Sequence, residues 1–213
     1  MDKPFCAVLG NFLGNANRMR MIEGILGSPF FGNSALGPEF IRTQGFSVVF
    51  RRDGMETVAA RFPFLEPILD QVLFADCNAF YINPLVLFDG SEVQAHIDCR
   101  LTPENVRIIP NLVSVYYAEV PLDMRGGALV LNTGHDNERR IQPRTDDLIH
   151  FLGTTIHRVE SMERGARRIS VVCEQYNLAS QTLAGFPACQ VIADAPGLGR
   201  INAAAPGDVL LDV

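Results

Sequence analysis

The chain has 213 residues, of which 47% are hydrophobic and 20% are charged, and its net charge at pH 7 is −6. This length and composition predict one globular domain with a sizeable core, and they argue against long disordered stretches. The acidic net charge argues against a broad nucleic-acid or anionic-membrane surface, because such partners usually require a basic excess.

The N-terminal residues Met-Asp-Lys-Pro-Phe-Cys lack the basic start and the unbroken apolar run of a secretory signal. No later apolar run approaches the roughly 18 residues that a membrane span needs. We therefore expect a cytoplasmic protein without a membrane partner. The five cysteines are odd in number and have no paired metal spacing, so we expect reduced, packed thiols and no structural zinc site.

The first third of the chain carries signals for helices and a strand. Apolar residues at spacings of three and four predict the helices, and glycine and proline mark their ends. In chain order we expect a helix over 15–26, a loop over 32–38, a strand over 46–50, a turn over 52–54 and a helix over 63–73.

From about residue 78 the sequence changes to short runs of β-branched and aromatic residues separated by glycine-containing turns. Such strands with regular turn signals predict a sandwich or jelly roll rather than βαβ units. We expect strands over 79–87, 92–97, 112–118, 128–131, 147–152 and 167–176. The tail from Ala179 has weak periodicity, and we expect it to wrap the surface. Within one domain, 1–213, we expect an N-terminal support of helices and a strand (1–77), a jelly-roll catalytic core (78–176) and a C-terminal extension (177–213).

Two histidines and an aspartate form the most informative pattern. His96 and Asp98 are two positions apart, so they share one face of a strand end, and His157 follows 59 positions after Asp98. Two imidazoles and one carboxylate can occupy one face of an iron octahedron and leave three positions open, as in non-haem Fe(II) oxygenases. Of the other histidines, we expect His135 in a solvated turn and His150 packed within a strand. We predict that His96, Asp98 and His157 are the metal ligands and the catalytic centre.

Further motifs follow in a fixed order: His96-Ile-Asp98, Val113-Ser-Val-Tyr-Tyr117, Gly126-Gly-Ala-Leu129, His157-Arg-Val and Arg164-Gly-Ala-Arg167. Over about residues 78–176 the chain resembles the 2-oxoglutarate and Fe(II)-dependent dioxygenases, within them the prolyl-hydroxylase-like branch. This resemblance implies a mainly β protein with flanking helices, the double-stranded β-helix or cupin-like jelly roll. It also implies Fe(II), 2-oxoglutarate and O2, with ascorbate as an additional cofactor.

The resemblance further implies that an arginine on the strand after the distal histidine binds the far carboxylate of 2-oxoglutarate, a task that suits a guanidinium fork. Arg167 shares a strand face with the apolar row Ile169–Cys173, as expected of a barrel interior, so we favour Arg167. Arg168 with Ser170 stays an alternative, because this Arg-x-Ser pair is used for the same carboxylate in some branches of the family.

Other cosubstrate contacts are also implied by the resemblance. Tyr117 corresponds to a tyrosine whose phenol bonds the cosubstrate carboxylate, and Leu129 to an apolar wall of the pocket. Where relatives often have a second tyrosine before the His-x-Asp strand, this chain carries Phe88, which cannot donate a hydrogen bond. Asn83 or Tyr81 on the preceding strand could substitute for it.

The resemblance implies hydroxylation of a C–H bond, because Asp98 fills the coordination position that a halide occupies in a halogenase. Gln94 and Arg100 flank the His-x-Asp element, Arg125 borders the Gly-Gly strand, and with Asn83 they are the predicted substrate residues. We therefore expect a small-molecule substrate such as a free amino acid, and no nucleic acid. The alternatives are a prolyl-type hydroxylase of peptides or proteins and a cupin-like metal protein that does not use 2-oxoglutarate. The sequence leaves the oligomeric state open.

Overall fold

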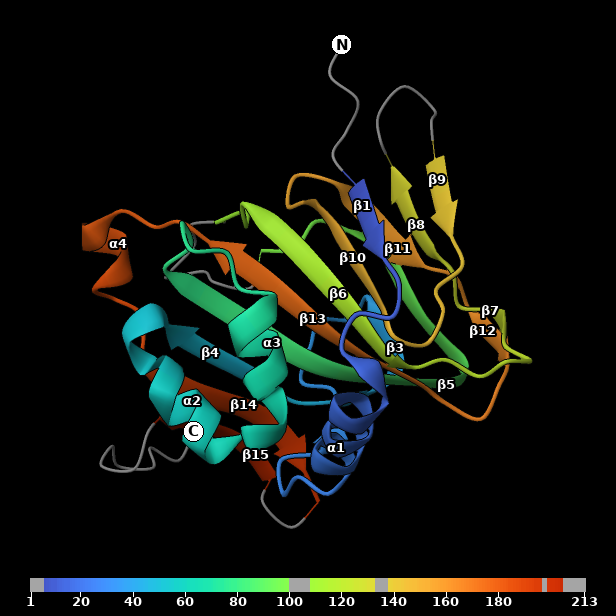
Figure 1. Cartoon of the computed structure of the whole chain (residues 1–213), viewed down its shortest axis with the longest axis horizontal. Coiled ribbons are helices and arrows are strands. Elements are labelled where there is room, and N and C mark those ends of the chain that lie inside the picture. Colours follow the sequence, from blue (N-terminus) through green and yellow to red (C-terminus); the bar gives the residue numbers. More distant parts are fainter. Residues whose placement is uncertain (1–5, 100–107, 133–137, 197–198, 205–213) are drawn as a thin grey trace.

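The computed structural model describes residues 6–99, 108–132, 138–196 and 199–204 (Figure 1). The helices are α1 (Gly14–Leu26), α2 (Met55–Arg61), α3 (Glu66–Gln71) and α4 (Ser180–Leu183), with 3-10 turns η1 (Arg52–Gly54) and η2 (Pro63–Leu65). The strands are β1 (Cys6–Leu9), β2 (Gly32–Asn33), β3 (Phe40–Gly45), β4 (Ser47–Arg51), β5 (Ala79–His96), β6 (Leu112–Glu119), β7 (Arg125–Gly126), β8 (Leu129–Asn132), β9 (Glu138–Ile141), β10 (Asp147–Leu152), β11 (Ile156–Val159), β12 (Met162–Arg164), β13 (Arg168–Tyr176), β14 (Cys189–Ala195) and β15 (Gly199–Ala204). Within the part of the chain described, no helix is long and apolar enough to cross a membrane.

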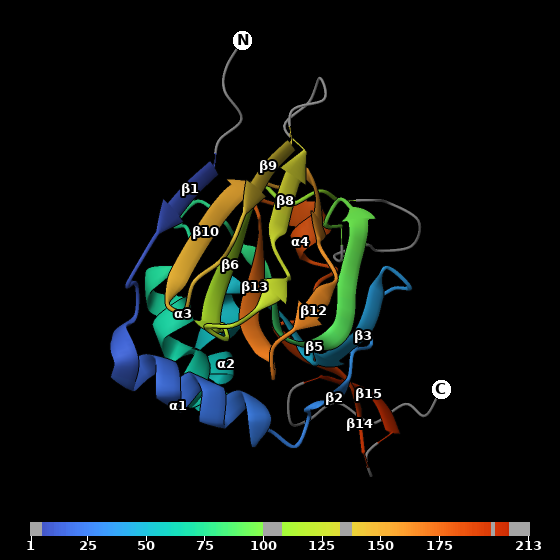
Figure 2. The ribbon, with the colours of Figure 1, turned by 90° about the vertical axis from the view of Figure 1, so that its right-hand side faces the viewer.

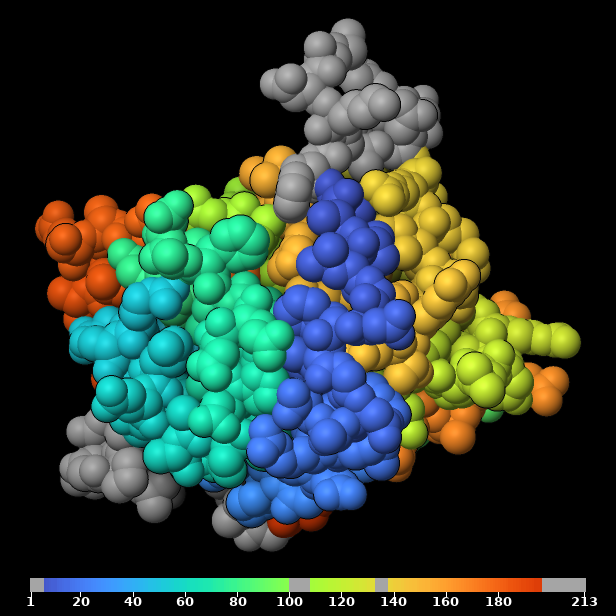
Figure 3. Space-filling view, in the orientation of Figure 1, coloured from blue at the N-terminus to red at the C-terminus, as the bar shows by residue number. Residues whose placement is uncertain are grey.

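The strands form two layers that are joined through β5. The larger layer has the order β1-β10-β6-β13-β5 and continues through β3 and β2 to β14 and β15, while β4 pairs with β5 and β14. The smaller layer is built from β11, which pairs with β5 and β8, and from β9, which pairs with β8. Helices α1, α2 and α3 cover the outer face of the larger layer (Figures 1 and 2), and in the space-filling view they form a continuous surface (Figure 3).

Strand β5 passes from one layer to the other. Its residues 79–87 pair with β13, whereas Val93 and His96 pair with β11. Gly90 lies between these two halves with a φ of 77°, a left-handed conformation that glycine adopts without steric cost. The two strands expected over 79–87 and 92–97 are therefore one strand that bends at the predicted turn.

Two of the three hydrophobic clusters among the described residues lie on opposite faces of the larger layer. The first packs that layer against the helices and includes Met21, Ile25, Leu65, Ile68, Phe80, Ile169 and Val171. The second fills the space between the two layers and includes Val113, Val115, Leu129, Leu131, Ile149 and Phe151. Strand β13 is consequently buried on both faces, and its apolar row belongs to the helix-covered face.

Most of the predicted elements are confirmed, with ends that differ by a few residues. The helix expected over 15–26 is α1, the helix expected over 63–73 comprises η2 and α3, and His150 is packed as expected. The expected surface path of the tail was wrong, because β14 pairs with β4 and β15 and extends the larger layer. In β14 every second residue is buried, from Cys189 to Ala195, but small residues carry this alternation and make it faint in the sequence.

Candidate metal centre and cosubstrate pocket

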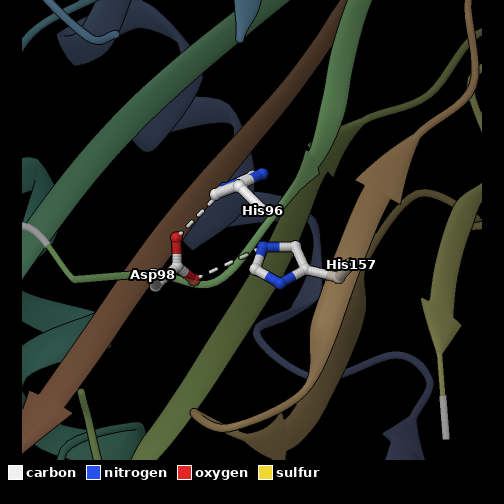
Figure 4. Close-up of side chains that lie close together, drawn as sticks. All are labelled: His96, Asp98 and His157. Atoms are coloured by element: carbon white, nitrogen blue, oxygen red, sulfur yellow. Dashed lines mark ion pairs between the residues drawn. The ribbon is translucent and has the colours of Figure 1, made fainter. Parts of the chain in front are cut away.

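His96, Asp98 and His157 converge at one end of β5 (Figure 4). His96 is the last residue of β5 and lies directly opposite His157 in the antiparallel pairing with β11, so the register brings the distant histidine to the His-x-Asp element. The Nε2 atom of His96 is 3.3 Å from Oδ1 of Asp98, and the Nε2 atom of His157 is 3.4 Å from Oδ2. The three potential ligand atoms lie within 4.8 Å of one another, which is the spacing expected of donors to one ion.

The remaining ring nitrogens are held by the backbone. Nδ1 of His96 is 2.8 Å from the carbonyl oxygen of Gln94, and Nδ1 of His157 is 3.1 Å from that of Thr155. A carbonyl oxygen only accepts hydrogen bonds, so each Nδ1 donates and each Nε2 keeps its lone pair on the side of Asp98. This second contact fixes the tautomer and the ring orientation that a metal ligand requires.

The environment of His157 keeps its imidazole neutral. Burial lowers the pKa of His157, and the negative charge of Asp98 opposes this shift only in part. Phe151 packs against the His157 ring at a centroid distance of 4.9 Å, and Phe40 packs edge-on against His96 at 5.2 Å. Metal binding requires neutral imidazole, so two such nitrogens with one carboxylate fit a first-row transition metal such as Fe(II).

The three side chains line a pocket between the two layers. Side chains from both layers complete its wall. They are Leu36, Phe40, Tyr81, Asn83, Leu85, Val93, Val115, Tyr117, Leu129, Val159, Arg168, Ser170, Val172 and Glu174.

Arg168 lies in this pocket with its side chain almost entirely buried, at 1% exposure. Its Nη1 atom donates to the carbonyl oxygen of Gly127 at 2.6 Å, and its guanidinium carbon is 5.2 Å from the ring centroid of Tyr117. Burial lowers the pKa of Arg168 and raises that of Tyr117. The Nε atom of Arg168 and the hydroxyl of Tyr117 are buried without a hydrogen-bond partner among the described residues, so the pocket offers unsatisfied donors that suit a carboxylate.

Arg167 lies outside the pocket, so the expectation that it points into the barrel was wrong. Its Nε donates to Glu119 at 2.5 Å, and its side chain is 39% exposed. The sequence analysis assigned the apolar face of β13 to the barrel interior. In the structure that face packs against the helices, and the opposite face, which carries Arg168 and Ser170, lines the pocket. Ser170 is fully buried, and its hydroxyl is 3.4 Å from the carbonyl oxygen of Leu85.

Leu129, Tyr81 and Asn83 line the pocket, as the sequence indicated. Phe88 packs against the helix-side core and is not among the residues that line the pocket, whereas Tyr81 and Asn83 are.

The other predicted substrate residues are not brought to the pocket. Gln94 is exposed and contributes its backbone carbonyl to His96, and Arg125 is exposed on β7. Arg100 lies outside the described residues. Sequence reasoning missed Glu174, although it shares the strand face of Arg168 and Ser170 and could have been found from that alternation.

No family model and no curated relative matches the chain. Solved structures do match, among them a prolyl hydroxylase from Trichoplax adhaerens in complex with a hypoxia inducible factor peptide fragment (17% identity, 84% of this chain and 86% of that one, TM-score 0.57). A Pseudomonas putida prolyl-4-hydroxylase matches at 16% identity over 82% and 94% of the two chains, with a TM-score of 0.56. HygX from Streptomyces hygroscopicus, with nickel, 2-oxoglutarate and hygromycin B bound, matches at 13% identity over 83% and 85%, with a TM-score of 0.52. The chain therefore has the double-stranded β-helix fold of the 2-oxoglutarate and Fe(II)-dependent oxygenases, and prolyl hydroxylases are among its structural neighbours.

Proposed function

We propose that this protein is a cytoplasmic Fe(II)- and 2-oxoglutarate-dependent oxygenase that hydroxylates a C–H bond of a small molecule such as a free amino acid. One observation carries the proposal: the pocket that contains the His-Asp-His cluster also contains the buried guanidinium of Arg168. A metal site alone would fit many cupin-like proteins, whereas a buried cation beside an unsatisfied tyrosine hydroxyl calls for a bound anion. In this proposal residues 78–176 form the catalytic core, and residues 1–77 and 177–213 support it.

His96, Asp98 and His157 would hold the iron, which supplies the activation of O2 that no protein side chain can perform. The protein contributes the orientation of the ligands and the exclusion of water. The carbonyl oxygens of Gln94 and Thr155 keep the imidazoles in the ligating tautomer.

Arg168 would bind the far carboxylate of 2-oxoglutarate through its guanidinium fork, with Ser170 beside it on the same strand face. The hydroxyl of Tyr117 would donate to the same carboxylate, and Leu129 would pack against the carbon chain. The carboxylate would neutralise a cation that the fold buries and would satisfy two donors at once, so the apo pocket is preorganised for it.

Two other functions compete with this proposal. A peptide or protein hydroxylase is the first, since the Trichoplax adhaerens neighbour was solved with a peptide fragment. A cupin-like metal protein without 2-oxoglutarate is the second, but such a protein has no need for the buried guanidinium of Arg168.

The test measures succinate formed from 2-oxoglutarate after Fe(II) and ascorbate are added, together with binding of 2-oxoglutarate to the metal-loaded protein. Free amino acids and short peptides are then compared as stimulants of this turnover. We expect binding and basal turnover, with stronger stimulation by an amino acid or a similar small molecule. A folded, metal-loaded protein that does not bind 2-oxoglutarate would contradict the proposal, and stimulation by peptides alone would favour the first competitor.

A further inference from the structure

A groove lies at the rim of the smaller layer, where β5 ends and β11 begins. Aliphatic residues dominate its wall, which consists of Ala95, Ile97, Ile109 and Ile156 together with Cys99, Glu39 and His96. His96 also lines the pocket of the His-Asp-His cluster. The groove and the pocket therefore adjoin at one residue of that cluster.

Strand alternation explains why the groove is apolar. His96 and His157 line the pocket, so Ala95 and Ile156, which precede them along the chain, project to the opposite side of the layer. His96 pairs with His157 across the two strands, and this register sets Ile156 beside the end of β5. Aliphatic side chains thus collect directly behind the two histidines.

The aliphatic side chains of the groove are open to solvent. Ile109 and Ile156 are 44% and 43% exposed, and Ala95 beside them is exposed as well. Single exposed apolar residues are common on protein surfaces, whereas a contiguous group next to a polar rim marks a binding site. Glu39 supplies that rim, and its carbonyl oxygen is fixed to β5 by the N–H of Gln94 at 2.9 Å.

The apolar surface is small, and this limits what can occupy it. Arg158 lies two residues after Ile156 on the same face of β11, and it pairs with Glu138 at 2.9 Å. The aliphatic area therefore gives way to charged residues within one step of the strand. The buried centre of a protein interface is depleted of such charges, so the groove suits an alkyl chain better than a protein partner.

We propose, on the basis of the proposed function, that this groove binds an aliphatic chain of the substrate, while the carbon to be oxidised lies at the His-Asp-His cluster. The position beside His96 lets one small molecule occupy both places. Ile109 and Ile156 offer no hydrogen bonds, so a polar chain would lose its bonds to water there without replacement. The substrate class is therefore a small molecule with an alkyl chain, and these two residues select it.

The experiment uses protein loaded with Zn(II), which has no redox chemistry, in the presence of 2-oxoglutarate. The probes are norvaline, norleucine and 2-aminoheptanoate, which add one methylene group at a time to the same amino-acid head, and ligand-observed NMR measures their dissociation constants. Full burial of a methylene group corresponds to about fourfold in affinity, so we expect a gain of at least twofold per added carbon. Glutamine, which has the chain length of norleucine but ends in an amide, should bind at least tenfold more weakly than norleucine.

The double variant Ile109→Asn/Ile156→Asn should bind the three probes with equal affinity within twofold, and circular dichroism checks that it is folded. Leu122→Asn is the matched control, because Leu122 is a fully exposed leucine that lines neither the groove nor the pocket. It should leave the whole series unchanged.

Equal affinity of the three probes for the wild-type protein, or no binding of any of them, would overturn the inference whether or not the double variant folds. A gain per methylene that persists in the double variant would also overturn it, because the chain would then lie in the inner pocket. Failure of 2-oxoglutarate itself to bind would instead contradict the proposed function.

Discussion

The guanidinium carbon of Arg168 lies 5.2 Å from the centre of the Tyr117 ring, and each of the two side chains has a buried donor without a partner among the described residues. An unsatisfied buried donor costs about 1–3 kcal/mol. A carboxylate bound between these two side chains would accept from both donors, and this relationship leads to the first two predictions.

Arg168→Gln should raise the KM for 2-oxoglutarate by at least thirtyfold. The loss of one partner from a buried, charge-assisted pair costs about 2–5 kcal/mol. Thermal unfolding gives an independent measurement, because a ligand that binds only the folded state raises the Tm. We expect 2-oxoglutarate to raise the Tm of the metal-loaded wild-type protein but not that of Arg168→Gln.

Arg167→Gln is the matched control on the neighbouring residue. Its ion pair with Glu119 is partly exposed, and exposed pairs contribute only about 0–1 kcal/mol. The KM for 2-oxoglutarate should change by less than twofold. The opposite result for the two variants would assign the carboxylate to Arg167 and refute the placement of the cosubstrate in this pocket.

Tyr117→Phe should have opposite effects on stability and on affinity. It removes a buried hydroxyl that has no partner among the described residues, so the free energy of unfolding of the ligand-free protein should stay level or rise by about 1 kcal/mol. It also removes a donor to the cosubstrate, so the dissociation constant of 2-oxoglutarate should rise about tenfold or more. Urea unfolding and calorimetric titration measure the two quantities.

The neighbouring Tyr116 provides the control. Its hydroxyl donates to Asp146 at 2.7 Å on the helix-side face of the same strand. Tyr116→Phe should destabilise the fold and leave the affinity for 2-oxoglutarate unchanged. If both variants destabilise the protein equally and neither affects 2-oxoglutarate, then Tyr117 is only a core residue.

Removal of any ligand of the triad should abolish metal-dependent turnover without unfolding the chain. His96→Ala, Asp98→Ala and His157→Ala each leave an incomplete facial site, while apolar burial continues to hold the strands. We expect metal binding to weaken at least a hundredfold, as measured by metal content after dialysis, with unchanged circular dichroism. His150→Gln, a substitution at a buried histidine on another strand, should keep its metal. Full turnover in two of the three alanine variants would exclude this triad.

The cluster of His96, Asp98 and His157 could be predicted from the sequence because its chemistry is carried by residue types at a recognisable spacing. His96 and Asp98 share a face through strand alternation alone, and only the place of His157 depended on the order of the motifs. The direction of Arg168 could not be predicted in this way. Alternation assigns residues to two faces but does not say which face is the pocket, and both faces of β13 are buried.

The proximity of Asn83 and Glu174 in the pocket wall could not be predicted, for a related reason. Glu174 and Asn83 lie on different strands, and their proximity depends on the register between β13 and β5, which pairs Val172 with Asn83. No local pattern encodes that register. A polar residue on a strand indicates a site only after the face of the strand that lines the pocket is known. For β13 the sequence analysis assigned the apolar face to the pocket, whereas that face packs against the helices.

The last prediction concerns pH and the buried His150. The Ser114 hydroxyl accepts a hydrogen bond from Gln175 at 2.8 Å and is also hydrogen-bonded to Nδ1 of His150 at 2.8 Å. Burial lowers the pKa of His150, as it does that of His157. Because the unfolded chain then binds protons more readily than the folded one, this contribution to stability is complete above about pH 6.5 and is lost as the pH falls below that value.

Urea unfolding of the metal-free protein at pH 7.5, 6.5 and 5.5 tests this sign. The free energy of unfolding should fall between pH 6.5 and 5.5 in the wild-type protein, and it should fall less steeply in His150→Gln, which keeps a side chain able to bond Ser114 but cannot be protonated in this range. His157 and the carboxylates titrate in both proteins, so the difference between the two slopes reports His150 alone. If the free energy of unfolding depends on pH equally in the two proteins, then His150 accepts a proton in the folded state as easily as in the unfolded one. In that case its burial, with the Phe74 ring centroid 5.7 Å away, does not keep it neutral.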